Sequence, residues 1–209
     1  MPPGLVVRKI GMTQIFDANG TISPVTILKA GLCQITRIKI TARDGSNGVQ
    51  IGYNEEKAKN LNKPKKGFLK KISSKGFKSL GEFRVNNPQK YKLGQFINVN
   101  LFKKGEKVRI IGTSIGKGFS GNQKRNNFSR GPMTHGSKNH RLPGSIGAGS
   151  TPGRVYPGKK MAGRSGNRIV TLTKVEIVYI NSRANLLVVK GSVPGKKNTF
   201  LRIQHTKST

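Results

Sequence analysis

A glycine-rich motif is the first candidate for a chemical site in this chain. Residues 116–121 read Gly-Lys-Gly-Phe-Ser-Gly and match the pattern G-x-G-x-x-G. A dinucleotide site would also need a strand before the motif, a helix after it and an acid about 20 positions further on. The next residues are polar or basic, and no acid follows before Glu176. We therefore interpret the glycines as letting the backbone approach a phosphate chain, with Lys117, Lys124 and Arg125 as neutralising donors.

Two histidines five positions apart, His135 and His140, are the second candidate. A zinc site needs further Cys, His, Asp or Glu ligands, and the neighbours Lys138 and Arg141 are instead positive. We expect no metal here, and predict that the imidazoles stack on a base or hydrogen-bond to a phosphate or a 2′-hydroxyl. A catalytic triad of nucleophile, general base and orienting acid is also not expected, because none of the seven acids falls in this polar region. The sequence thus predicts no enzyme, no cofactor and no small-molecule substrate.

The charge balance indicates a polyanionic partner. The 209 residues include 40 Lys and Arg but only 7 Asp and Glu, which gives a net charge of +33 with His neutral. Nucleic acid is the first candidate partner and an anionic membrane surface the second, since only an external polyanion relieves such self-repulsion.

We expect no membrane-spanning segment, because no apolar run approaches roughly 20 residues. The opening residues resemble neither a secretory signal nor an organellar leader. The single cysteine, Cys33, is predicted to be a small buried apolar residue in a reducing compartment.

Residues 112–168 differ in kind from the rest of the chain. They contain 13 of the 27 glycines and 4 of the 10 prolines, and no acid occurs from Lys107 to Thr173. Such a segment cannot offset its ordering entropy by building its own core. We interpret it as an extended arm that becomes ordered along phosphates, and folded RNA suits an irregular arm better than duplex DNA does. The candidate RNA-binding residues are the basic and imidazole side chains of this arm: Lys117, Lys124, Arg125, Arg130, His135, Lys138, His140, Arg141, Arg154, Lys159, Lys160, Arg164 and Arg168.

The rest of the chain is predicted to be mainly β. Apolar side chains alternate with polar ones, and turn residues separate the alternating runs. Many short strands at this spacing favour a small closed or nearly closed antiparallel barrel over βαβ units. The alternating residues are Val25 and Ile27; Ile38 and Ile40; Val49, Ile51 and Tyr53; Ile97, Val99 and Leu101; and Val170, Leu172, Val175, Ile177, Tyr179, Leu187 and Val189. The expected turns lie at 18–20, 44–48 and 181–185.

The chain is therefore expected to have two parts. Residues 1–111 together with 169–209 form the barrel body, and 112–168 form the arm. Within the body, 54–93 is expected to be a basic, partly helical excursion, with one helix opening at Pro64. A solvated basic loop is the alternative for that excursion.

Four segments carry a resemblance to a known family. The stretch 112–171, which begins GTSIGKGFSG and ends SGNRIVT, resembles the central signature of the ribosomal protein L-three family. LVVRKIGMTQIF at 5–16, PVTILKAG at 24–31 and NLLVVKGSVPG at 185–195 resemble the same family. The short, one-piece form is similar to its bacterial and plastid branch.

The resemblance implies a structural protein of the large ribosomal subunit. In this family the body is a barrel of the type shared with translation factors, and the insertion reaches through large-subunit rRNA toward the peptidyl transferase centre. Members bind this 23S-type rRNA near its 3′ end and act early in assembly, so the implied partners are rRNA and neighbouring large-subunit proteins. By the same resemblance, His140 to Thr151 form the deep tip of the arm. The tip residues near the peptidyl transferase centre are then Gly144, Ser145, Gly147 and Ser150.

This chain departs from the family at two positions. Many bacterial relatives have a methylated glutamine where this chain has Ser150, so that modification cannot occur here, and many carry a ring where it has Asn126. Abundant Lys, Ile and Asn fit an AT-rich genome, which favours the plastid (chloroplast) stroma over a bacterial cytoplasm.

Two other functions compete with the ribosomal one. A nonspecific nucleic-acid-packaging protein would bind any duplex alike, and an RNA-modifying enzyme would need a cofactor loop or a catalytic acid.

Overall fold

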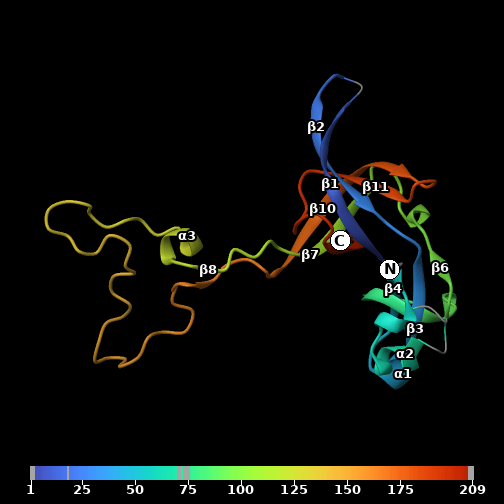
Figure 1. The fold of residues 1–209 in the computed structure, drawn as a ribbon, viewed down its shortest axis with the longest axis horizontal. Helices are drawn as coiled ribbons and strands as arrows, with labels where there is room; N and C mark the ends of the chain where they lie inside the picture. The colour runs from blue at the N-terminus through green and yellow to red at the C-terminus, as the bar shows by residue number, and fades with distance from the viewer. Residues whose placement is uncertain (1–2, 18, 70–71, 73–75, 207–209) are drawn as a thin grey trace. The chain divides into compact units, whose positions relative to one another are not determined.

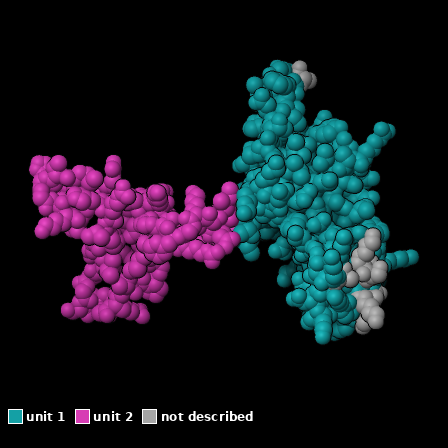
Figure 2. Space-filling model, viewed as in Figure 1, with its two compact units in different colours: residues 1–113, 169–209 teal, residues 114–168 magenta. Residues whose placement is uncertain are grey.

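The computed structural model describes residues 3–17, 19–69, 72 and 76–206. The chain divides into two compact units, which are coloured separately in Figure 2. Unit 1 consists of residues 1–113 with 169–209, and unit 2 consists of residues 114–168. Ala18, in the first expected turn, lies outside the described residues.

Six strands of unit 1 form a closed barrel in which every neighbouring pair is antiparallel (Figure 1). These strands are β1 (Leu5–Phe16), β2 (Ile22–Lys29), β7 (Lys107–Thr113), β10 (Ile169–Asn181), β11 (Leu186–Lys190) and β12 (Phe200–His205). Their order around the barrel is β1-β12-β7-β10-β11-β2. Successive residues of a strand face opposite sides of a sheet, and Leu28, Ile110 and Ile203 are fully buried members of one core cluster. The prediction of a mainly β chain is confirmed.

Strand β10 departs from the expected simple alternation. Its pairing register shifts between Leu172 and Val175 against β7, and again between Ile177 and Tyr179 against β11. Each shift of one residue turns the following side chains to the other face of the sheet. Ile177 is therefore fully buried whereas Tyr179 is 51% exposed, so the prediction of one shared apolar face is wrong for Tyr179.

A second sheet of four strands also belongs to unit 1. Its strands are β3 (Cys33–Lys39), β4 (Gly48–Glu56), β5 (Gly76–Arg84) and β6 (Phe96–Ile97). Their order is β5-β4-β3-β6. The sequence predicts a single barrel for the body, and this is wrong for these strands. Alternation at Val49, Ile51 and Tyr53 correctly marks one buried face, but it does not say which sheet the face belongs to; these residues pack in the same core cluster as Leu5 of the barrel.

The basic excursion 54–93 contains more strand than the sequence indicates. β5 pairs with β4 from Gly76 to Arg84, although its glycines and lysine obscure the period of two. The expected helical content is present in shorter pieces, and residues 70–71 and 73–75 lie outside the described part. These pieces are the 3-10 helices η1 (Ala58–Asn60) and η2 (Pro88–Lys90) and the helix α2 (Lys63–Leu69), which opens one residue before Pro64.

Two further expectations on local structure are corrected. The alternating residues Ile97, Val99 and Leu101 predict one strand, but β6 ends at Ile97 and a 3-10 helix, η3 (Val99–Leu101), follows. Val99 is still buried, so the apolar pattern reports burial rather than strand here. The expected turn at 44–48 is preceded by a four-residue helix, α1 (Thr41–Asp44), which ends where Gly45 adopts a φ of 71°.

Cys33 begins β3 inside the core of unit 1. Its side chain is fully buried, and Sγ lies 3.4 Å from the carbonyl oxygen of Val6. Burial disfavours the charged thiolate and raises the pKa of the Cys33 thiol to about 12. The prediction of a small buried residue is confirmed.

No helix in the described part of the chain is long and apolar enough to cross a membrane.

Candidate nucleic-acid interface

Unit 2 opens and closes through a neck, which we define as residues 114–120 and 163–168. Within the neck, β8 (Phe119–Ser120) pairs with β9 (Gly163–Arg164). Backbone hydrogen bonds join the two limbs: Ser114 N–H to Arg168 O (2.8 Å), Lys117 N–H to Ser165 O (2.9 Å) and Ser165 N–H to Gly118 O (2.9 Å). The neck therefore holds its limbs by backbone hydrogen bonds rather than by an apolar core, and the ring of Phe119 is 80% exposed.

A short helix, α3 (Asn122–Asn126), ties the outgoing limb of unit 2 to the returning one. Arg125 donates from Nη1 to the carbonyl oxygen of Met161 at 2.5 Å, and Asn126 donates from Nδ2 to the same oxygen at 3.1 Å. Asn126 Nδ2 also donates to Oδ1 of Asn122 at 3.0 Å. The Asn126 amide thus acts as a clamp between the outgoing and returning limbs of unit 2.

Residues 131–140 close on themselves beyond α3. Gly131 N–H donates to the carbonyl oxygen of His140 (3.2 Å), and Gln123 Nε2 donates to that same oxygen (3.2 Å). The His140 ring lies with Nδ1 2.9 Å from the carbonyl oxygen of Pro132. His140 is therefore oriented by its own chain, and Gln123 fixes residue 140 against α3.

The predicted tip residues Gly144, Ser145, Gly147 and Ser150 are all exposed. Ser145 donates from Oγ to the carbonyl oxygen of Gly147 at 3.1 Å, and Gly144 adopts a φ of 73°. The tip is thus a run of exposed backbone that is shaped by local bonds.

The predicted RNA-binding residues fall into two groups. Arg125 and His140 are half-buried and make the internal contacts described above. The other eleven are exposed, and within the described residues their side chains make no hydrogen bond or ion pair: Lys117, Lys124, Arg130, His135, Lys138, Arg141, Arg154, Lys159, Lys160, Arg164 and Arg168. This exposed group keeps its charges available to an external anion.

Three of these cations converge on one hollow of unit 2. The hollow has a volume of about 650 Å³, and Lys117, Lys124 and Arg141 line it together with the exposed ring of Phe119. Lys117 belongs to the neck, Lys124 to α3, and Arg141 follows the residue that Gln123 holds against α3. Hydrogen bonds between distant parts of the sequence thus bring the three charges together.

The candidate RNA-binding residues predicted from the sequence leave out two contributors to this hollow. Phe119 is recognisable in the sequence only as one ring among glycines, and its exposure is what makes it available for contact. Gln123 carries no signal in the sequence, because its role depends on the position of His140 in the fold.

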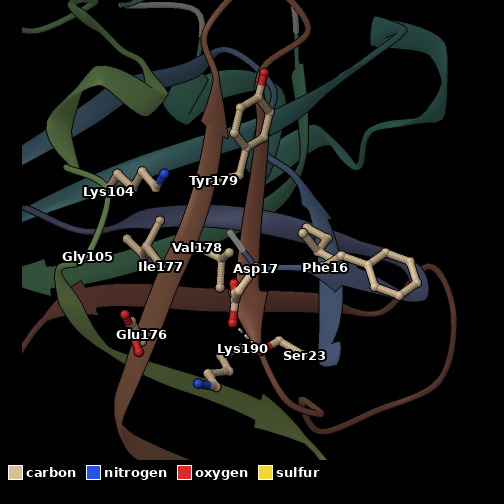
Figure 3. A pocket seen from close by; sticks show the side chains of 11 residues that line it. Phe16, Asp17, Ser23, Lys104, Gly105, Glu176, Ile177, Val178, Tyr179 and Lys190 are labelled. Carbon is tan, nitrogen blue, oxygen red and sulfur yellow. Dashed lines mark hydrogen bonds between the residues drawn. The ribbon is translucent and has the colours of Figure 1, made fainter. Parts of the chain in front are cut away.

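A hollow in unit 1 offers a contrasting chemistry (Figure 3). Its volume is about 630 Å³, and its charged lining consists of Asp17, Glu176, Lys104 and Lys190. Asp17 accepts a hydrogen bond from Ser23 at 3.1 Å, drawn as a dashed line in Figure 3. Because two carboxylates balance two ammonium groups, this hollow has no bias toward a polyanion.

Charge is distributed differently in the two units. Unit 2 has eleven Lys and Arg residues and no acid, whereas all seven acids lie in unit 1 with the other 29 Lys and Arg residues. In unit 1, acids form short ion pairs, for example Asp44 with Arg37 (2.6 Å) and Glu82 with Lys39 (2.7 Å). Among the described residues, no group of three or more His, Cys, Asp or Glu side chains could hold a metal ion. Unit 2 is therefore suited to binding phosphates.

Comparison of this chain with known proteins identifies its family. The family model described as "Ribosomal protein L3" matches residues 82–186, which include all of unit 2. The large ribosomal subunit protein uL3c of Emiliania huxleyi is 59% identical over 203 residues, which cover 97% of this chain and 98% of that protein. The large ribosomal subunit protein uL3c of Cyanophora paradoxa is 54% identical over 207 residues, covering 99% of each chain. The large ribosomal subunit protein uL3 of the cyanobacterium Gloeothece citriformis is 54% identical over 209 residues, covering 100% of this chain and 99% of that one. With matches of this extent and identity, the chain belongs to the ribosomal protein L3 family.

Proposed function

We propose that this chain is a structural, non-catalytic constituent of the large ribosomal subunit and that unit 2 is its rRNA-binding arm. The single observation that carries the proposal is that unit 2 contains no acid and that its exposed cations have no partner among the described residues. The chain also belongs to a family of ribosomal proteins. Each cation that meets a phosphate releases counterions, so eleven Lys and Arg residues on one small unit favour a polyphosphate over any single anion.

The finer parts of the proposal come from the family resemblance. The chain binds 23S-type rRNA near its 3′ end as a primary binding protein, and it nucleates subunit assembly beside neighbouring large-subunit proteins. The barrel body is of the translation-factor type, and residues 144–150 of the arm reach toward the peptidyl transferase centre. The compartment is the ribosome of a plastid stroma, with a bacterial cytoplasm as the alternative; relatives named uL3c and cyanobacterial relatives named uL3 support both.

Sedimentation tests this function in the native particle. A cell extract is washed at high salt and separated on a gradient, and the chain is followed by mass spectrometry. A protein whose arm is enclosed between RNA helices stays on the large subunit in stoichiometric amount. Release into the light fractions would instead identify a salt-labile polycation and favour the packaging alternative.

Matched double substitutions test the role of the arm. Lys159→Gln with Lys160→Gln removes two adjacent exposed charges from unit 2, and Lys196→Gln with Lys197→Gln removes a similar pair from unit 1. Each lost phosphate contact lowers the salt slope of binding by about 0.7–0.9. We expect the arm pair to lower the slope for large-subunit rRNA by roughly 1.4–1.8 and the control pair to lower it less. Equal reductions, with equal affinity for unrelated duplexes, would contradict the proposal.

A further inference from the structure

The hollow in unit 2 combines three kinds of contact group in one place. Lys117, Lys124 and Arg141 bring positive charge, Phe119 brings an aromatic face, and Gln123 brings an amide. All are residues of unit 2, so the hollow is complete within one compact unit. It includes part of the glycine-rich motif at 116–121, which the absence of a nearby acid had excluded as a dinucleotide site.

The cations of the hollow are free to meet a phosphate. Unit 2 contains no acid, and within the described part of the chain none of the three side chains makes a hydrogen bond or an ion pair. They come from positions 117, 124 and 141, which the hydrogen bond from Gln123 to the carbonyl oxygen of His140 helps to bring together. Because α3 has only five residues, its N-terminus is not treated as an anion site. The positive charge of the hollow comes from the Lys and Arg side chains.

The aromatic face of the hollow is unusual in its exposure. Phe119 is 80% exposed, although a phenyl ring normally gains by burial. Bases that leave a helical stack find new stacking partners on aromatic side chains, whereas bases inside an A-form helix cannot reach a ring of this kind. The ring therefore favours a single unstacked base over a duplex surface.

The amide of the hollow is held in one orientation. Gln123 donates through Nε2 to the carbonyl oxygen of His140 at 3.2 Å, and within the described residues its Oε1 accepts no hydrogen bond. Beside it, Asn122 is only 5% exposed, and its Oδ1 accepts the bond from Asn126 at 3.0 Å. A fixed carbonyl oxygen beside an aromatic face can accept a hydrogen bond from the edge of a stacked base.

We propose that this hollow captures one unstacked nucleotide of the rRNA. Its base lies on Phe119 within reach of Gln123, and its phosphates lie among Lys117, Lys124 and Arg141. This inference rests on the proposed function of unit 2 as an rRNA-binding arm, and it adds a defined site for a single nucleotide to the general attraction for phosphate.

Substitutions of two exposed rings separate this site from general arm binding. The full-length chain carries Phe119→Ala, and the matched control is Tyr156→Ala, which removes a 60% exposed ring of the same unit that does not line the hollow. Affinity and salt slope are measured with a transcript of large-subunit rRNA and with an unrelated RNA duplex. We expect Phe119→Ala to weaken rRNA binding about 5- to 150-fold at unchanged salt slope, since one base stack is lost and no phosphate contact. Phe119→Tyr retains the affinity, and Tyr156→Ala weakens binding less than Phe119→Ala does.

Photo-crosslinking gives a second, direct readout. A photoreactive p-benzoylphenylalanine at position 119 is expected to crosslink predominantly to one nucleotide of the rRNA. If Phe119→Ala and Tyr156→Ala have the same effect, or the crosslinks scatter along helices, the nucleotide site is refuted while the proposed function stands. If the unaltered chain binds the rRNA no better than the duplex, the proposed function itself fails and the inference falls with it.

Discussion

The close approach of the two limbs at Gly166 allows a sharp test of how unit 2 is ordered. Gly166 has a φ of 70°, and a Cβ built on it would overlap the carbonyl oxygen of Ile115 on the opposite limb. Gly136 has the same φ of 70°, but an added Cβ there meets nothing within 4 Å. Alanine at either position pays the same left-handed strain, about 1–2 kcal/mol. The difference between Gly166→Ala and Gly136→Ala therefore isolates the contact between the limbs.

The size of the effect follows from the hydrogen bonds beside Gly166. To admit the new methyl group, the limbs must separate where Lys117 N–H bonds to Ser165 O and Ser165 N–H bonds to Gly118 O, each at 2.9 Å. Each bond contributes about 1 kcal/mol net, so Gly166→Ala weakens the neck by about 2 kcal/mol more than Gly136→Ala does. A tenfold change in an opening equilibrium corresponds to about 1.4 kcal/mol, and the predicted difference is therefore roughly 30-fold.

Amide hydrogen exchange on the free full-length chain measures this difference. We expect the Lys117 and Ser165 amides to exchange about 30 times faster in Gly166→Ala than in Gly136→Ala. The Ile110 amide, in strand β7 of unit 1, serves as an internal reference and should be unchanged. Equal exchange at Lys117 and Ser165 in the two variants would refute the reasoning, because the neck would then tolerate the methyl group without losing its bonds.

Two further predictions concern unit 1. The buried Cys33, with its pKa raised to about 12, should resist alkylation in the native chain at mildly alkaline pH and react fully in denaturant, because the thiolate is the reactive form. Mass spectrometry after iodoacetamide treatment checks this prediction. Rapid modification of the native chain would contradict it. Lys9 donates from Nζ to the carbonyl oxygens of Val193 and Gly195, at 2.9 Å each, so Lys9→Met should lower the free energy of unfolding by about 2 kcal/mol in urea titrations. The exposed Lys190→Met is its control, and an equal loss in both variants would argue against these bonds.

The sequence predicts the fold of unit 1 as far as local alternation reports burial. Val49, Ile51 and Tyr53 lie on a buried face as expected, because a period of two needs no knowledge of the partner strand. Assignment of that strand to the second sheet depends on pairing with β5, whose sequence does not alternate clearly. The exposure of Tyr179 depends on register shifts that arise between strands and leave no mark in β10 alone.

The candidate interface is predictable in its charge and unpredictable in its grouping. A lysine in an acid-free polar segment has no partner to find nearby, so the exposure of residues such as Lys159 follows from composition. Arg125 has the same sequence environment, yet the structure uses its guanidinium to clamp Met161. The convergence of Lys124 and Arg141 likewise depends on a hydrogen bond from Gln123, which only the folded chain makes.

Under the proposed function, the absence of acids from unit 2 favours phosphate binding in two ways. In unit 1 an acid readily captures a cation, as Asp44 does with Arg37 at 2.6 Å. A carboxylate in unit 2 would capture one of its eleven Lys and Arg residues in the same way, and it would also repel the phosphates of the proposed rRNA partner. Both effects weaken binding, and neither is offset by a core. The limbs are held by backbone hydrogen bonds and by side-chain hydrogen bonds to neutral acceptors such as Met161 O. A unit that is ordered without acids can therefore direct nearly all of its charge outward, as the proposed role of an rRNA-binding arm requires.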